Sequence, residues 1–280
     1  PIYMAQTTPQ ERQLLVERHL VSRHFAESAL PRTLGVDAEE ALSVMVNEED
    51  HLRIQTILPG FRLAEAFDLA RRYDQSVEGS VDFAFSSRWG YLTACPTNVG
   101  CGVRMGVMLH LPGLRYTGEM ERVKRAAKDM HLALRGFYGE GTDTIGNFYQ
   151  VSNQLTLGFS EDELLRRFVE ETVPTLVDYE REARRVLAES NRPYLEDKVH
   201  RATATLRAAR LLGAEEASKL LSNLRLGICL GLIPDVSLEL VQRLLLQVQP
   251  AHLARLDPTA TDDDKGRLAR ATLVRRALRN

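Results

Sequence analysis

The sequence has few cysteines, little net charge and no long apolar run. Its 280 residues include three cysteines, none of them in a Cys-x-x-Cys pair, so a disulfide framework and a zinc site are excluded and a reducing compartment, the cytoplasm, is expected. A formal net charge of −2 gives no reason to expect nucleic acid or an anionic membrane as the main partner. No stretch approaches the roughly 18 apolar residues that a membrane-spanning helix needs.

The usual signatures of ATP-using enzymes are absent as well. The chain has no Gly-x-x-x-x-Gly-Lys-Ser/Thr loop and neither the His-Arg-Asp nor the Asp-Phe-Gly motif of protein kinases. Its apolar content of 44% and charged content of 26% are those of an ordinary globular protein. An ATP site in this chain would therefore have to be lined by arginines.

Apolar periodicity divides the chain into a mixed part and a helical part. Strands are expected at 41–46, 51–58, 81–85, 91–93, 103–111 and 147–157, and helices at 11–30, 61–74, 118–134 and 160–189. Because strands and helices do not alternate regularly, residues 1–189 are predicted to form an α+β domain with a mostly antiparallel sheet flanked by helices. Residues 190–280 are predicted to form an all-helical C-terminal domain, with helices at 194–212, 214–232, 237–247 and 264–278.

A charge cluster at residues 47–53 is the first candidate site. It reads Asn-Glu-Glu-Asp-His-Leu-Arg and stands between two apolar runs. One interpretation is a solvated turn between two strands. The other is a binding site inside a strand-like segment, because charges on a buried strand are costly unless they are paired or bind something. The direct continuation of Arg53 into the second apolar run favours the strand-like segment.

Two further stretches offer reactive groups. Residues 95–104, Cys-Pro-Thr-Asn-Val-Gly-Cys-Gly-Val-Arg, form a shaped turn between strands. There Cys95 is either a buried structural cysteine or a thiol drawn toward thiolate by nearby cations. Residues 135–141, Arg-Gly-Phe-Tyr-Gly-Glu-Gly, form either an ordinary surface hairpin or a loop whose glycines let Glu140 swing in over a substrate.

Together the three stretches contain the groups that phosphoryl transfer needs. Glu49 and Glu140 are two carboxylates, and Arg53, Arg104 and Arg135 are three cations. Guanidinium groups match phosphate geometry, and phosphoryl transfer requires cations around the transferred group and an aligned nucleophile. Two carboxylates suit a planar, cationic nucleophile, because each can grip one edge of a guanidinium and one can accept its proton.

These motifs resemble the signatures of the phosphagen (ATP:guanido) kinase superfamily, and most closely those of its bacterial protein-arginine kinases. The resemblance rests on residues 47–53, 95–104, 135–141 and 149–154 and on the helical tail with its Gln-Pro-Ala at 249–251. It implies an antiparallel sheet covered by helices, followed by a helical domain. It also implies ATP-dependent phosphorylation of arginine side chains in proteins, which marks them for Clp-type proteolysis.

The resemblance further implies a role for each candidate residue. Glu49 and Glu140 would hold the substrate guanidinium and assist its deprotonation, with Cys95 beside it as a thiolate. The ATP phosphates would be gripped by Arg53, Arg104 and Arg135. Mg²⁺ would be held mainly by ATP and water, without a dedicated protein ligand. The implied partners are protein substrates, a Clp protease system with an activator protein, and a second copy in a homodimer.

The chain departs from the family pattern in three places. No Ser-Ser-Arg-x-Arg-like segment precedes residue 47, so the chain is expected to lack the family's N-terminal segment. Cys101 stands where the family has threonine, and Met105-Gly106 where it has Ala-Ser. Gly266-Arg267 replace the first two residues of an Arg-Asp-x-x-Arg-Ala motif that recognises phosphoarginine in the family.

Two functions of different classes remain open. One is an ATP-dependent protein-arginine kinase, which the complete set of Glu49, Cys95, Arg104, Arg135 and Glu140 favours. The other is a catalytically impaired adaptor or regulator that binds arginine or phosphoarginine proteins, which the missing upstream arginines favour. A kinase of small guanidino compounds is disfavoured by the helical tail, since this tail resembles the protein-modifying branch.

Overall fold

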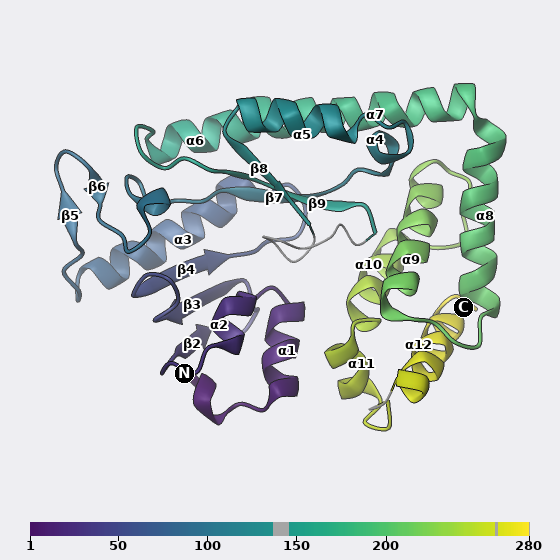
Figure 1. The fold of residues 1–280 in the computed structure, drawn as a ribbon, viewed down its shortest axis with the longest axis horizontal. Helices are drawn as coiled ribbons and strands as arrows, with labels where there is room; N and C mark the ends of the chain where they lie inside the picture. Colours follow the sequence, from purple (N-terminus) through teal and green to yellow (C-terminus); the bar gives the residue numbers. More distant parts are fainter. Residues whose placement is uncertain (137–145, 261–262, 280) are drawn as a thin grey trace. The chain divides into compact units, whose positions relative to one another are not determined.

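The computed structural model describes residues 1–136, 146–260 and 263–279. The chain divides into two compact units, each assembled from three segments. Unit 1 comprises Pro1–Met108, Lys124–Leu134 and Gln150–Val177, and unit 2 comprises Leu109–Val123, Arg135–Tyr149 and Asp178–Asn280. The order of the elements can be followed in Figure 1.

Unit 1 contains a four-stranded antiparallel sheet in the order β1-β2-β3-β4. Its strands are β1 Ile2–Tyr3, β2 Thr33–Val36, β3 Leu42–Val46 and β4 Leu52–Thr56, the 3-10 helix η1 Met4–Gln6 follows β1, and helix α3 Leu63–Glu78 packs against β4. Leu34 and Met45 are partners across β2 and β3, and both are fully buried. Arg53 is opposite Met45 and shares its face of the sheet. On the other face, the Thr56 hydroxyl donates to the Ala66 carbonyl of α3 (2.8 Å).

Two helices replace the single helix expected at 11–30. They are α1 Pro9–Glu17 and α2 Arg23–Glu27. Between them His19 adopts a left-handed φ of 58°, and the Ser22 hydroxyl accepts a hydrogen bond from the Phe25 amide (3.0 Å). The prediction of one continuous helix is therefore wrong, because Ser22 acts as a new N-cap and restarts the helix after a turn.

A three-stranded sheet in the order β7-β9-β8 follows further along the chain. The elements in this part are β5 Phe85–Ser86, β6 Gly90–Tyr91, the 3-10 helix η2 Pro96–Asn98, β7 Gly106–His110, α4 Pro112–Tyr116, α5 Met120–Asp129, β8 Leu132–Arg135 and β9 Phe148–Asn153. Strands β5 and β6 pair as an antiparallel hairpin. The prediction of a helix at 118–134 is wrong at its C-terminal end. His131 adopts a left-handed φ of 54° there, and the chain continues as β8.

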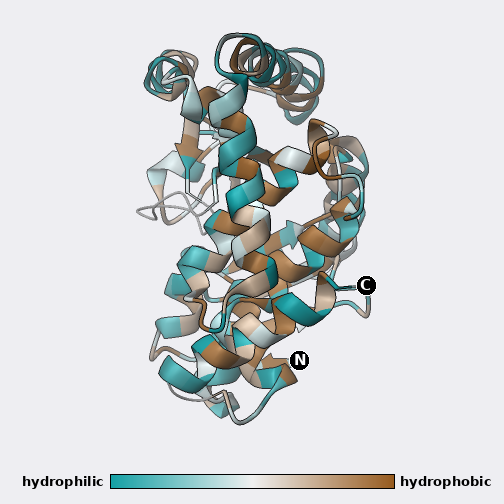
Figure 2. Ribbon diagram, turned by 90° about the vertical axis from the view of Figure 1, so that its right-hand side faces the viewer, coloured by the Kyte–Doolittle hydropathy of each residue, from teal (hydrophilic) through white to brown (hydrophobic). Residues whose placement is uncertain are grey.

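Helices account for most of the remaining chain. They are α6 Glu161–Arg167, the π-helical turn η3 Phe168–Thr172, α7 Val173–Ser190, α8 Arg192–Ala208, α9 Ala214–Cys229, α10 Leu238–Gln247, α11 Pro250–Leu256 and α12 Asp263–Ala277. Helices α8, α9, α10 and α12 share one core that includes Leu206, Leu221, Leu244 and Val274. Figure 2 shows that the helices of this part carry both hydrophobic and hydrophilic residues. Helix α11 is not predicted from the sequence, although proline is favoured in a first helical turn.

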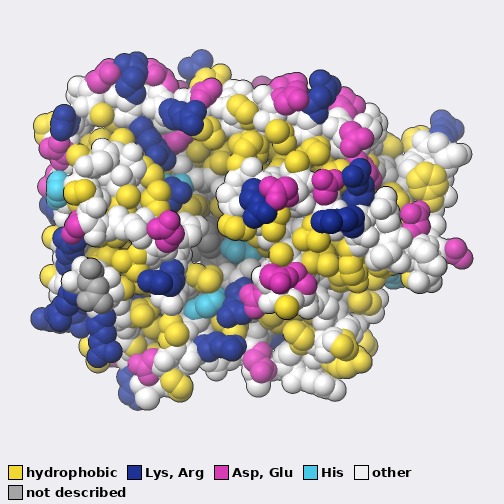
Figure 3. Space-filling model, turned by 180° about the vertical axis from the view of Figure 1, so that it is seen from behind, with side chains coloured by type: hydrophobic (Ala, Val, Ile, Leu, Met, Phe, Trp, Pro, Cys, Tyr) yellow, Lys and Arg dark blue, Asp and Glu magenta, His cyan; other side chains and the backbone are white. Residues whose placement is uncertain are grey.

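Basic side chains gather near the end of α12. Burial and then the charges of Arg210, Arg279 and Arg276 lower the pKa of Arg275, so these four arginines lie near one another. Lys and Arg side chains group at the lower left of the face drawn in Figure 3. Across the part of the chain that the structure describes, no helix has the length and apolar character that crossing a membrane requires.

The packing of α8 against α9 depends on Gly227. A methyl group there would collide with the buried Val199 side chain and lie 3.1 Å from Ile233. We expect Gly227→Ala to lower the free energy of unfolding by about 1–3 kcal/mol, measured by urea denaturation, because a filled core cannot accept another carbon. Gly79→Ala is the control, since its nearest neighbour is the Ser76 carbonyl at 3.7 Å. Equal losses in the two variants would contradict the packing argument.

Candidate active site

The charge cluster forms the loop of the β3–β4 hairpin. Residues 47–51 connect the paired ends of the two strands, and the Asn47 amide donates to the His51 carbonyl (2.9 Å). Asn47 enters the loop with a left-handed φ of 62°, which asparagine tolerates better than most residues. The interpretation of the whole cluster as part of a strand is therefore wrong. A turn occupies 47–51, and Arg53 lies within β4.

The Glu48 side chain is only 6% exposed and ties this loop to α2. Its carboxylate accepts hydrogen bonds from the Ser22 hydroxyl (2.5 Å) and the Glu49 amide (2.7 Å) and lies 3.5 Å from the Arg53 guanidinium. Burial acts to raise the pKa of Glu48, but the Ser22 hydrogen bond, the charge of Arg53 and the Glu49 amide outweigh it and hold the pKa below its usual value. Glu48 is therefore an ionised anchor of the loop.

The ionised Glu48 should stabilise the fold in a pH-dependent way. Because its pKa is lower in the folded chain, its contribution is complete above the usual value of 4.5 and is lost as the pH falls through the folded value. We expect Glu48→Gln to lower the free energy of unfolding by about 1–3 kcal/mol at neutral pH. Urea denaturation at several pH values should show this gap closing below pH 4.5. A gap that widens in acid would contradict the role of Glu48, and the exposed Glu39→Gln is the control.

Asp50 and Asn98 join the first motif to the second. The Asp50 carboxylate accepts hydrogen bonds from the Ala94 amide (2.6 Å) and from the side-chain amide of Asn98 (3.1 Å). The same Asn98 amide lies 3.4 Å from a Glu49 carboxylate oxygen. One amide group thus holds two carboxylates of the hairpin loop against the turn that begins with Cys95.

Cys95 precedes η2 and is half-buried. Its sulfur lies 3.0 Å from the Thr97 hydroxyl, and its carbonyl accepts hydrogen bonds from the Asn98 amide (3.0 Å) and the Thr93 hydroxyl (2.7 Å). It is therefore not the fully buried cysteine of the alternative interpretation. Burial raises the pKa of the Cys101 thiol and keeps it protonated at neutral pH.

Thr156 supports this turn and is not identified from the sequence. Its hydroxyl lies within hydrogen-bond distance of the carbonyls of Thr97 (3.0 Å) and Val99 (2.7 Å), and its carbonyl accepts from the Cys101 amide (3.2 Å). Gly100, with a φ of 119°, permits this approach, because a side chain there would overlap the Thr156 backbone. The shape of the turn is therefore set by a residue more than 50 positions away along the chain.

Asn153, at the end of β9, holds the backbone on both sides of Arg104. Its side-chain oxygen accepts a hydrogen bond from the Met105 amide (2.7 Å), and its side-chain nitrogen donates to the Val103 carbonyl (3.0 Å). Asn153 is 4% exposed, so water does not compete for these bonds. The sequence signal that could have found it is its place in the 149–154 run.

The remaining candidate residues are Arg53 in β4, Arg135 at the end of β8, and Glu140, which follows β8 in the sequence. The Arg53 guanidinium faces Glu48 and lies 3.4 Å from the Gln55 side-chain oxygen. Arg135 is the last residue of β8 and belongs to unit 2, and Glu140 lies outside the described residues. Unit 1 therefore contains Glu49, Arg53, Cys95 and Arg104. Within the described residues, no group of three or more His, Cys, Asp or Glu side chains could hold a metal ion.

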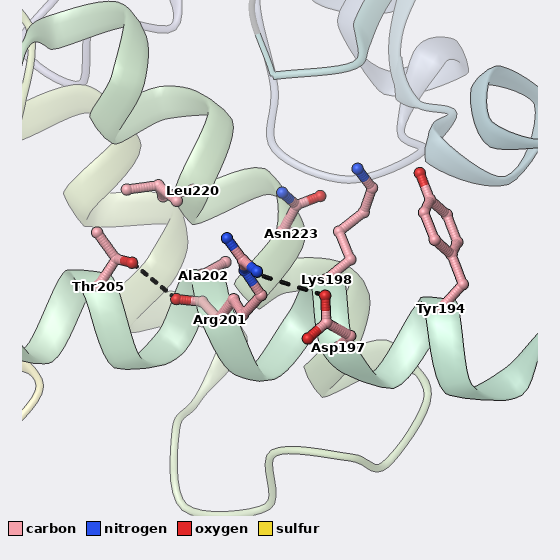
Figure 4. Close-up of a pocket in the computed structure, with 8 residues that line it drawn as sticks. All are labelled: Tyr194, Asp197, Lys198, Arg201, Ala202, Thr205, Leu220 and Asn223. Atoms are coloured by element: carbon pink, nitrogen blue, oxygen red, sulfur yellow. Dashed lines mark hydrogen bonds and ion pairs between the residues drawn. The ribbon is translucent and has the colours of Figure 1, made fainter.

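A hollow of about 280 Å³ between α8 and α9 is separate from these residues (Figure 4). It is lined by Tyr194, Asp197, Lys198, Arg201, Ala202 and Thr205 of α8 and by Leu220 and Asn223 of α9. Arg201 lies 3.9 Å from Asp197, and the Lys198 ammonium stands 5.3 Å from the centre of the Tyr194 ring. None of the candidate residues lines it, so it is not part of the candidate active site.

Two family models together match almost the whole chain. Residues 2–183 match the ATP:guanido phosphotransferase C-terminal catalytic domain, and residues 192–280 match the protein-arginine kinase McsB C-terminal domain. The protein-arginine kinase of Brevibacillus brevis is 43% identical over 277 residues, which cover 97% of this chain and 77% of that protein.

Solved structures of two other guanidino kinases share the fold. The duplicated taurocyamine kinase of Schistosoma mansoni matches with a TM-score of 0.59 and 26% identity, over 64% of this chain and 26% of that chain. A lombricine kinase matches with a TM-score of 0.54 and 26% identity, over 63% of this chain and 52% of that chain. The predicted α+β class with an antiparallel sheet and a helical C-terminal region is confirmed. The chain belongs to the protein-arginine kinase family of ATP:guanido phosphotransferases.

Proposed function

We propose that this chain transfers the γ-phosphoryl group of MgATP to the guanidino group of arginine side chains in proteins. The observation that supports this most is the contact of Asn98 with both Glu49 and Asp50. This contact holds the Glu49 carboxylate beside the turn that carries Cys95, and a carboxylate there is suited to bind a guanidinium. An adaptor would have no need of this juxtaposition.

In the proposed reaction, Glu49 and Glu140 hold the two edges of the substrate guanidinium, and one of them accepts a proton. The deprotonated nitrogen attacks the γ-phosphorus, so that an N–P bond forms while the bond from this phosphorus to the β–γ bridging oxygen breaks and ADP leaves. Cys95 lies beside the guanidino group and assists through its charge, without a covalent intermediate. The proton that leaves nitrogen ends on the carboxylate.

Arginines supply the positive charge around the phosphates in this proposal. Arg53, Arg104 and Arg135 bind the ATP phosphates, because a planar guanidinium can form two parallel hydrogen bonds to a phosphate. Magnesium enters with its substrate as MgATP, held by phosphate oxygens and water. In this proposal Arg53 has two roles, since it binds phosphate and its side chain also faces the Glu48 carboxylate.

We further propose a catalytic domain at 1–189 and a helical domain at 190–280. The limits of the two family matches and the break between α7 and α8 support this division. Delivery of the phosphorylated proteins to a Clp protease and a homodimer stay predictions that rest on family resemblance. A cytoplasmic location stays a prediction that rests on the few cysteines of the chain.

Mass spectrometry tests the proposed activity directly. The protein is incubated with MgATP and an arginine-rich protein, and acid-labile phosphoarginine is sought in the product. Phosphorylation on arginine supports the kinase. Phosphorylation of free guanidino compounds without any on protein would favour a small-molecule kinase. Binding of the protein without transfer to any acceptor would favour the adaptor.

A conservative change of Asn153 should act through Arg104. We expect Asn153→Asp to raise the KM for MgATP about tenfold with a smaller change in kcat, because aspartate cannot donate to the Val103 carbonyl and the backbone next to Arg104 loosens. Steady-state kinetics measure this, with thermal unfolding in parallel. Asn191→Asp, an exposed position before α8, is the control. An unchanged KM in Asn153→Asp would show that Arg104 does not depend on it.

A further inference from the structure

A second hollow, of about 530 Å³, lies in unit 1 between the β5–β6 hairpin and the start of α6. Both elements are found on the left of Figure 1. The volume falls within the range of about 300–1,000 Å³ that is usual for ligand sites. The hairpin lines the hollow with aromatic side chains and Arg88, and α6 lines it with the carboxylates of Glu161 and Asp162.

The aromatic rings of the hairpin are open to solvent. Trp89 is 45% exposed and Phe85 is 60% exposed, and the ring of Tyr91 packs edge-on against Phe85 with centroids 5.4 Å apart. The Arg88 guanidinium lies 4.5 Å from the centre of the Trp89 ring, so this ring already stacks with one guanidinium and has the geometry that suits another on its open side. Exposed aromatic faces of this kind bind arginine and lysine side chains.

Carboxylates of α6 line the hollow, and carboxylates of α3 act on two of its lining residues through their charge. Burial, and then the charges of neighbouring aspartates including Asp74, raise the pKa of Glu161 despite the opposing charge of Arg71. The pKa of the Tyr91 hydroxyl is raised by burial and by Asp74, Glu78 and Glu161. Within the described ranges, these three carboxylates form no ion pair. The hollow thus combines open aromatic rings with two carboxylates, Glu161 and Asp162, and one cation, Arg88, among the residues that line it.

The hollow and the candidate active site share one turn of the chain. Gly100, Cys101 and Thr156 line the hollow, and the same turn begins at Cys95. Cys101 is six positions after Cys95, and six residues of extended chain span at most about 20 Å. A bound polypeptide can therefore reach both places at once.

We propose that this hollow binds an arginine side chain of the protein substrate, a second arginine within about six residues of the one that receives the phosphoryl group. Its planar guanidinium stacks on Trp89 and donates to the carboxylate of Glu161. A lysine binds more weakly, because an ammonium group neither stacks nor offers a planar fork of donors. The identity of the occupant as substrate rests on the proposed function.

Fluorescence of Trp89, the single tryptophan of the chain, reports occupation of the hollow. The blocked peptide Gly-Arg-Gly should change the emission saturably, Gly-Lys-Gly more weakly and Gly-Glu-Gly not at all. Glu161→Gln should weaken Gly-Arg-Gly binding about tenfold. Glu170→Gln, an exposed carboxylate that does not line the hollow, should leave it unchanged. Equal responses to the three peptides, or an unchanged affinity in Glu161→Gln, would overturn the proposal.

Peptide kinetics separate docking from catalysis. For an acceptor peptide with a second arginine about four residues away, Glu161→Gln should raise KM to the value of a single-arginine peptide and leave kcat unchanged. A loss of kcat with both peptides would assign Glu161 to the reaction or the fold and overturn docking. If the unaltered protein phosphorylates neither peptide, the proposed function fails, while the fluorescence titration still decides whether the hollow binds arginine.

Discussion

Replacing Glu49 by glutamine is expected to lower the rate of phosphoryl transfer by about 10²- to 10⁴-fold, the usual cost of losing a general base. Glutamine keeps the length of the side chain and an oxygen for Asn98, but it neither accepts a proton nor neutralises a guanidinium. Glu49 is exposed at the tip of the hairpin loop, so its thermal unfolding midpoint should stay near that of the unaltered protein. The measurement is kcat and KM with MgATP and an arginine-containing protein.

Two further variants test whether the loss of activity in Glu49→Gln is specific to the two carboxylates that hold the guanidinium. Glu39→Gln, an exposed change in the turn before β3, should retain full activity. Glu140→Gln should lose activity by a factor in the same range, because family resemblance assigns it the other edge of the guanidinium. Full activity in both Glu49→Gln and Glu140→Gln would refute the assignment of the two carboxylates.

The candidate residues could be predicted from the sequence because each motif is a contiguous stretch. The contacts that hold the motifs together could not, because they join residues that are far apart. Asn98 reaches Glu49 across 49 positions, and Asn153 reaches Met105 across 48. Asn153 lies in the 149–154 run that carries the family resemblance, but the local pattern around Thr156 does not mark it as a support of a turn elsewhere in the chain.

The hairpin loop shows why a local pattern can mislead about structure. Apolar residues flank the 47–53 cluster on both sides, which is typical of a continuous strand. The chain instead turns at Asn47, and the turn is held by Ser22, which bonds Glu48 from 26 positions away. The same hydroxyl caps α2 through the Phe25 amide, so Ser22 takes part in both places where the structure differs from the predicted elements.

Very short strands were also beyond sequence reasoning. Strand β1 has two residues and β2 has four, too few to show an alternating pattern. Their strand geometry comes from pairing, of β1 with β2 and of β2 with β3. The alternation of β3 itself is clear, because Met45 is buried and its neighbours are half-buried. The long helices were predicted more closely, since an apolar stripe of three or four turns is specific.

Arg104→Met is expected to lower kcat/KM for MgATP by about 10²- to 10³-fold, the usual cost of losing one donor to a developing charge. The backbone on both sides of Arg104 is held by the buried Asn153, so the side chain of Arg104 starts from a fixed backbone. A fixed donor loses less conformational freedom on binding a phosphate. Arg104→Lys should recover part of the loss, because lysine restores the charge but not the bidentate geometry.

A double variant of Arg104 and Asn153 is the strictest control for this prediction. If Asn153 acts through Arg104, adding Asn153→Asp to Arg104→Met should change kcat/KM little further, whereas independent effects would multiply. Arg122→Met, whose side chain is 81% exposed, should leave the kinetics unchanged. A multiplied loss in the double variant would mean that Asn153 supports the turn as a whole. Wild-type kcat/KM in Arg104→Met would mean that the phosphates are bound by other arginines.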